Sequence, residues 1–225
     1  VLHCAPPPPA GSTDTRTANL LAALKAGGIL PSRLVYISTS GVYGDCGGDW
    51  IDEARPVKPQ TARAIRRVDA EEQVCAWARA HDVAVVVLRV PGIYAADRLP
   101  TARLLQGTPV LDDQDDVYTN HIHADDLAAI ALRALATDAP AGVYNASDDS
   151  AMKMGAYFDL VADRFGLPRP PRVSRAAAAQ AISPGMLSFM GESRRLVNTK
   201  MKQVLGVRLR YPTVNEGVPA GSVVA

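Results

Sequence analysis

Short apolar runs alternate with longer amphipathic segments along the first 95 residues. The apolar runs at 1–5, 33–39 and 83–90 have the length of strands, and their hydrophobic residues occupy consecutive positions, as in strands buried on both faces. The segments between them, 14–28 and 61–81, carry apolar residues at helical spacing, and the first ends at two glycines. This order predicts an α/β fold, a doubly wound parallel sheet of the Rossmann-like kind.

The pattern after residue 95 is less regular. We expect a smaller α/β lobe in residues 96–225, with 117–148 returning to the main sheet formed by 1–95. The predicted strands are 117–123 and 142–148, and the predicted helices are 98–107, 124–137, 152–166, 174–183 and 198–206.

Composition narrows the class of protein. The 225 residues carry a net charge of +1, which gives no electrostatic reason to expect nucleic acid or an anionic membrane as a partner. The longest apolar run, 83–90, is too short to span a bilayer. The three cysteines, Cys4, Cys46 and Cys75, lack metal-site spacing and favour reduced thiols in a cytoplasmic protein.

Candidate chemistry lies where the apolar runs end. Three hydroxyl residues, Ser38, Thr39 and Ser40, follow the run that ends at Ile37. The segments "CAPP" and "PGIY" stand at the ends of the neighbouring runs. Ligands of open parallel sheets bind outside the carboxyl ends of the strands, so these segments are expected to share one site.

Six segments in order resemble the extended short-chain dehydrogenase/reductases of the NAD-dependent epimerase/dehydratase type. They are "VLHCA", "ISTSGVYGD", "DEARPVKP", "LRVPGIYA", "NHIHADDLA" and "NTKMKQVLGVRLRYPT". The resemblance implies NAD or NADP as cofactor and hydride transfer to or from a small hydroxylated or nucleotide-sugar substrate. It also allows a homodimer, and it makes residues 1–95 the C-terminal part of a dinucleotide-binding domain and 96–225 mainly its substrate-side lobe.

The resemblance also implies roles for individual residues. Thr39 takes the position of the catalytic hydroxyl, which would hydrogen-bond a substrate oxygen. The implied cofactor contacts are Cys4, Ala5, Pro6, Ser38, Arg67, Pro91, Gly92 and Ile93, and the implied substrate contacts are Arg63, Tyr94, Asn120 and His123.

Two features of the family are absent from the sequence. No GxxGxxG turn follows the first strand, so we expect about 60 to 75 further residues upstream, the length of two βαβ units. The YxxxK motif, which moves a proton and holds the ribose, is replaced by Arg63 and Arg67. An arginine stays protonated and cannot shuttle a proton. Tyr43 is therefore a candidate substitute acid, or else an aromatic residue that packs the loop.

The histidines leave a further alternative. His121 and His123 would face one side of a strand, which could suit a metal, but we predict no metal there because the segment resembles a metal-free family. The leading hypothesis is an NAD(P)-dependent oxidoreductase or epimerase. The rival is a non-catalytic NAD(P)-binding sensor or regulatory protein, and a metal-dependent hydrolase is a third class.

Overall fold

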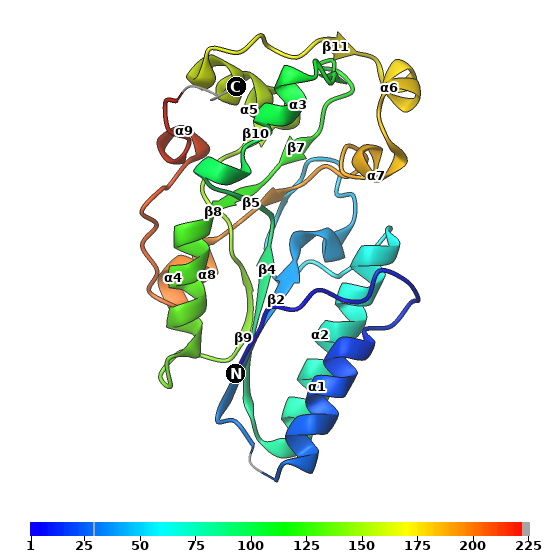
Figure 1. Ribbon diagram of the computed structural model, residues 1–225. Helices are drawn as coiled ribbons and strands as arrows, with labels where there is room; N and C mark the ends of the chain where they lie inside the picture. Colours follow the sequence, from blue (N-terminus) through cyan, green and yellow to red (C-terminus); the bar gives the residue numbers. More distant parts are fainter. Residues whose placement is uncertain (29, 222–225) are drawn as a thin grey trace.

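Four parallel strands form the central sheet of the protein. The computed structural model describes residues 1–28 and 30–221, and its main sheet has the order β1-β2-β4-β9 (Figure 1). The strands are β1 Leu2–His3, β2 Arg33–Thr39, β4 Ala84–Val90 and β9 Gly142–Asn145. All three pairings are parallel, which confirms the predicted Rossmann-like sheet.

Helices cover both faces of this sheet (Figure 1). Helices α1 (Thr15–Ala26) and α2 (Ala62–His81) lie on one face, and α4 (Ala124–Leu135) and α8 (Thr199–Val204) lie on the other. Side chains alternate between the faces along β2, so that Leu34 and Tyr36 pack towards α1 and α2 while Val35 packs towards α4. This two-sided burial explains the unbroken apolar character of the strands.

A smaller lobe stands at the carboxyl ends of the main strands, in the upper part of Figure 1. Its strands pair two by two, as β5–β8, β7–β10 and β6–β11, while β3 and β12 pair beside the main sheet. The further strands are β3 Trp50–Ile51, β5 Gly92–Tyr94, β6 Val110–Leu111, β7 Tyr118–Thr119, β8 His121–His123, β10 Met152–Lys153, β11 Arg172–Val173 and β12 Arg195–Leu196. The remaining helices are η1 Ser40–Tyr43, η2 Ala96–Arg98, α3 Thr101–Leu105, α5 Met154–Phe165, α6 Arg175–Ala181, α7 Pro184–Leu187 and α9 Val214–Gly217.

Two predicted elements are divided in the structure. Segment 117–123 forms two strands, because the Asn120 side chain accepts from the Leu196 N–H at 2.8 Å and donates to the Arg194 carbonyl at 2.9 Å. The strand predicted there was therefore wrong as one element, and β8 pairs with β5 rather than with the four-stranded sheet. The first two residues of 152–166 form β10 before the helix begins. Within the described residues, none of the helices is both long and apolar enough to cross a bilayer.

A buried ion pair ties α2 to the sheet. Arg89 in β4 donates to both carboxylate oxygens of Glu71 in α2, from Nη2 at 2.8 Å and from Nε at 3.3 Å. Ser38 in β2 donates to the same carboxylate at 2.5 Å. The side chains of Arg89 and Glu71 are only 8% and 9% exposed. Each charge therefore depends on the other, because a buried ion without its partner is strongly destabilising.

Replacement of Arg89 by an uncharged residue should test whether Glu71 depends on it. We expect Arg89→Leu to lower the free energy of unfolding by about 3 to 5 kcal/mol, since Glu71 is left buried without a counter-ion. The double variant Arg89→Leu/Glu71→Gln should recover part of that loss, because glutamine is neutral and still accepts from Ser38. Urea unfolding of the three proteins measures the difference.

Asp163→Asn is the matched control, since it breaks an ion pair with Arg169 whose side chains are 53% and 62% exposed. It should lower the free energy of unfolding far less than Arg89→Leu, because water screens an exposed ion pair. An Arg89→Leu protein as stable as this control would show that the buried pair does not hold α2 in place.

Candidate functional site

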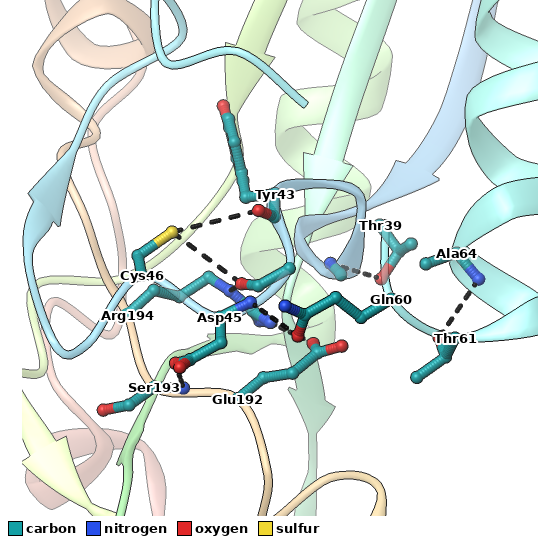
Figure 2. A network of polar contacts seen from close by, with 12 residues as sticks. Thr39, Tyr43, Asp45, Cys46, Gln60, Thr61, Ala64, Glu192, Ser193 and Arg194 are labelled. Carbon is teal, nitrogen blue, oxygen red and sulfur yellow. Dashed lines mark hydrogen bonds and ion pairs between the residues drawn. The ribbon is translucent and has the colours of Figure 1, made fainter. Parts of the chain in front are cut away.

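A polar cavity opens at the carboxyl ends of β2 and β4. Thr39 is the last residue of β2 and lies level with Val90 of β4, which places Pro91 beside it. The Thr39 hydroxyl oxygen accepts from the Gly41 N–H at 3.3 Å, so it caps the short helix η1 (Figure 2). The polar cavity has a volume of about 190 Å³. Its walls include Thr39, Ser40, Gly41, Arg63, Pro91, Gly92, Tyr118, Thr119, Asn120, Met154, Phe189, Glu192 and Arg194.

Arg63 forms the wall on the side of α2. Its guanidinium lies 3.7 Å from the centre of the Phe189 ring and donates to the Ser188 hydroxyl at 2.9 Å. Burial lowers the pKa of Arg63, and the nearby carboxylate of Glu192 partly opposes this shift. Arg63 therefore connects the main domain to the segment after α7 and remains a cation at the cavity wall.

Arg67 lies one turn further along α2, outside this cavity. It donates to the Ile37 carbonyl at 2.8 Å and to the Tyr36 hydroxyl at 3.0 Å. Ser38, a predicted cofactor contact, donates to Glu71 and is buried. Both residues thus have partners within the fold, and only Arg67 is partly open to solvent.

A further part of the wall comes from a segment far along the chain. Glu192 and Arg194 form a buried ion pair, and Arg194 also donates to the Gly44 carbonyl at 2.9 Å (Figure 2). The second carboxylate oxygen of Glu192, Oε1, is buried and has no hydrogen-bond partner within residues 1–28 and 30–221. Asn120 holds this segment by its two bonds to the backbone of Arg194 and Leu196. Glu192 is thus a carboxylate at the cavity wall with spare hydrogen-bonding capacity.

Tyr43 does not face the polar cavity. It is 1% exposed, and its hydroxyl donates to the Asn145 side-chain oxygen at 2.8 Å. Burial raises the pKa of Tyr43, and the neighbouring Arg89 partly opposes this. Figure 2 shows its ring directed away from Thr39. The geometry therefore gives no support to the expectation of a substitute acid and favours the alternative, an aromatic residue that packs the loop.

A second cavity, the aromatic cavity, adjoins the polar one and shares Gly92, Thr119, Met154 and Phe189 with it. Its volume is about 270 Å³. Two predicted contacts, Ile93 and Tyr94, line it, and Ile93 is 38% exposed. The other lining residues are Arg98, Pro100, Arg103, His121, Tyr157, Phe158 and Met186.

The two histidines of β8 have different surroundings. His121 lines the aromatic cavity with its ring centre 4.3 Å from that of Tyr157, whereas His123 packs on Tyr211 and accepts from the Asp125 N–H at 3.1 Å. His123 therefore caps α4 and lies away from both cavities, which gives no support to its expected contact with substrate.

Not all predicted residues meet at one place. Thr39, Pro91, Gly92, Arg63 and Asn120 share the polar cavity. Cys4, Ala5 and Pro6 belong to the exposed chain after β1, at the same end of the sheet but outside both cavity linings. Sequence reasoning missed Thr119, Phe189, Glu192, Arg194 and Arg103.

The missed residues left a weak signal. "GESRRL" at 191–196 places three charged residues before an apolar one, a pattern that a surface loop would share. Long-range contacts in the folded chain, among them those with Gly44 and Asn120, bring this segment to the strand ends.

Burial shifts the pKa of two groups, the His121 ring in the lining of the aromatic cavity and the neighbouring Asp148 carboxyl group. It lowers the pKa of His121 to about 3, so this ring is neutral near pH 7. Burial also raises the pKa of Asp148 to about 7, with the hydrogen bonds from Ser150 opposing the shift. The Asp148 N–H donates to the His121 carbonyl at 2.8 Å, so the two groups are structural neighbours.

Comparison with known proteins identifies similar chains. The model of the NAD dependent epimerase/dehydratase family matches residues 15–147. A solved conserved protein of unknown function from Silicibacter pomeroyi DSS is 31% identical, with a TM-score of 0.82 over 96% of this chain and 75% of that one. UDP-glucuronic acid 4-epimerase from Bacillus cereus, solved in complex with NAD, has the same fold at 16% identity and a TM-score of 0.76, over 98% of this chain and 72% of its own. The 3-diazoavenalumate denitrifying reductase of Streptomyces sp is 27% identical over 90% of this chain and 68% of its own.

Ionisation of Asp148 should destabilise the protein as pH rises. The folded-state pKa of about 7 exceeds the usual 3.8, so the folded state holds the proton more tightly between these values. We expect Asp148→Asn to gain stability over the natural protein as pH rises from about 4, and to level off above 7. The gain should reach at most about 4 kcal/mol, the equivalent of three pKa units.

Urea unfolding at a series of pH values tests this. Comparison at each pH removes the contribution of His121, whose lowered pKa acts in the opposite direction. Asp97→Asn, at an exposed position, should show no such trend. A stability difference that is independent of pH would contradict the raised pKa of Asp148.

Proposed function

The chain belongs to the NAD-dependent epimerase/dehydratase family, and from this premise we propose that it is an NAD(P)-dependent oxidoreductase acting on a small carbonyl or hydroxyl substrate. The observation that carries the proposal is the Thr39 hydroxyl in the wall of the polar cavity, at the carboxyl end of β2. Ligands of this architecture bind at that edge of the sheet.

The residues at this edge fit the nicotinamide half of NAD or NADP. Pro91 and Gly92 offer a wall without bulky side chains, and the partly exposed Ile93 offers apolar surface for a flat ring. Arg67 would hold the ribose or a phosphate with the nitrogens that it does not use towards Ile37 and Tyr36. The cofactor would supply or accept a hydride when bound.

Thr39 is proposed to polarise the substrate oxygen. Its hydroxyl accepts one bond from Gly41, which fixes the oxygen and leaves the hydrogen available to a ligand in the cavity. A hydrogen bond that strengthens as negative charge develops on the substrate oxygen lowers the barrier selectively.

Glu192 is proposed to move the proton. Arg63 cannot do so, because a guanidinium does not release its proton at neutral pH. The carboxylate of Glu192 lies in the same cavity wall as Thr39, and its Oε1 has no partner among the described residues. Arg194 orients this carboxylate through the ion pair. A positioned carboxylic acid is a general acid–base group in many enzymes.

The relatives support a choice of substrate class only broadly. One is named as a reductase, and one solved neighbour as a UDP-sugar epimerase. Reduction of a small substrate needs one hydride, which the bound cofactor would supply, and one proton, which Glu192 would supply. Thr39 would hold the substrate oxygen that receives the proton. The replacement of the tyrosine by Arg63, bound to Ser188 and Phe189, favours a second candidate, a non-catalytic NAD(P)-binding sensor.

Three further expectations remain proposals. Residues 1–95 would serve the cofactor, and 96–225 mainly the substrate. A cytoplasmic location would suit the three free cysteines. A homodimer would be compatible with the family.

Thr39→Ala should remove turnover but not cofactor binding. We expect kcat/KM to fall by about 100-fold or more, the usual cost of losing a donor to a developing oxyanion. The dissociation constant for NADH or NADPH should change by less than about threefold. Both quantities can be measured with a panel of small carbonyl substrates and nucleotide sugars.

Ser32→Ala, exposed at the other end of the sheet beside the start of β2, is the control and should behave as the natural protein. Turnover that survives Thr39→Ala would remove the proposed mechanism. Dinucleotide binding without turnover on any substrate would favour the sensor.

Glu192→Gln tests the proton route separately. Glutamine keeps the size and the acceptor for Arg194 but cannot exchange a proton. We expect kcat to fall by about 100-fold or more with little change in KM, and the pH–rate profile to lose one of its limbs. Glu72→Gln, at an exposed position of α2, should retain both limbs. An unchanged pH profile in Glu192→Gln would exclude Glu192 as the proton donor.

A further inference from the structure

Arg103 brings an unneutralised charge to the aromatic cavity. Its Nε and Nη2 atoms are buried and have no hydrogen-bond partner in the part of the chain that the structure describes. Its guanidinium lies 4.4 Å from the centre of the Phe158 ring. Burial is the sole cause that lowers its pKa, with no described carboxylate opposing it.

The arginines that are fully buried have hydrogen-bond or ion-pair partners. Arg89 is paired with Glu71 and Arg194 with Glu192, while Arg33 donates to the Thr137 carbonyl. Arg103 differs from these arginines, because its side chain makes no hydrogen bond within residues 1–28 and 30–221. Arg103 is half-buried, but two of its guanidinium nitrogens are buried without a partner, which is costly to stability and calls for a compensating role.

The remaining walls of the aromatic cavity are almost uncharged. Six aromatic and methionine residues belong to the lining, namely Tyr94, Tyr157, Phe158, Phe189, Met154 and Met186. His121 is neutral because burial keeps its pKa near 3, and its Nδ1 also lacks a partner among the described residues. Arg98 is the other cation in the lining and is exposed to solvent. No aspartate or glutamate belongs to the described lining.

We infer that the aromatic cavity binds the carboxylate end of an apolar or aryl substrate, with Arg103 as its counter-ion. This inference rests on the proposed function and names its substrate class. The apolar body would pack against the aromatic and methionine side chains, which favour flat and polarisable groups. Nε and Nη2 form one edge of the guanidinium, and this edge can take a carboxylate in a bidentate manner.

The place of the cavity fits this arrangement. Gly92, Thr119, Met154 and Phe189 are common to the aromatic and polar cavities. A molecule anchored at Arg103 can therefore extend past these residues towards Thr39. The lining is unsuited to a nucleotide diphosphate, whose several charges would meet two arginines, one of them exposed, and mainly apolar walls.

Binding measurements without cofactor test the inference independently of turnover. We would titrate the protein with 3-phenylpropanoate and with its neutral amide, 3-phenylpropanamide, by calorimetry or NMR. The acid should bind at least about tenfold more tightly than the amide, the usual effect of a charge-assisted pair. In Arg103→Gln this preference should fall to about twofold or less.

Controls separate a local effect from loss of the fold. Arg79→Gln, exposed at the far end of α2, should keep the full preference for the acid. Arg103→Gln should melt no lower than the natural protein, because the change removes an unpaired buried charge. Thr39→Ala should keep the preference too, so a failed enzyme assay would not affect this result.

Three results would overturn the inference. They are equal binding of acid and amide, a preference that survives in Arg103→Gln, and binding of UDP-glucose by a protein that binds neither aryl probe.

Discussion

The buried contact of Arg89 with Glu71 is the constraint on which the site depends. A cation in the middle of the sheet can be tolerated only if a carboxylate meets it, and Glu71 of α2 is that carboxylate. Ser38 shares the same acceptor, so β2, β4 and α2 are joined at one point. The position of α2 along the sheet is thereby fixed, and with it the positions of Arg63 and Arg67 relative to Thr39.

A second tie closes the other side of the polar cavity. Arg194 reaches the Gly44 carbonyl from a segment 150 residues away. Gly44 has a φ of +68°, and a Cβ there would lie 2.1 Å from the Lys58 carbonyl oxygen, so only glycine fits. The loop after Thr39 thus packs closely against residues 58–60 on one side and is hydrogen-bonded to residues 192–194 on the other. The cavity exists because two distant segments are held against one loop.

The sequence predicted the frame of the fold better than the site. Strands buried on both faces are apolar throughout, so β2 and β4 were evident, as was the meeting of Thr39 and Pro91 at their ends. The ion pair between Arg89 and Glu71 was not predicted, because it forms only when α2 packs on the sheet. Tyr43 was ambiguous because a phenol can face a ligand or a core, and only its bond to Asn145 decides. Glu192 and Arg103 were hidden because their importance lies in what surrounds them, and local spacing carries no information about that.

Arg63, which we expect at the position of the family's tyrosine, connects the two cavities. A tyrosine at position 63 would offer a proton to the substrate, whereas Arg63 stacks on Phe189 and binds Ser188. Phe189 is a wall of both cavities, so the residue that replaces the proton donor holds the partition between the polar cavity and the aromatic one. The half-buried Arg63 therefore has a positional role that a phenol could not take over without releasing this segment. The proton donor that we propose, Glu192, belongs to the segment that Arg63 holds, and its Oε1 has no partner among the described residues.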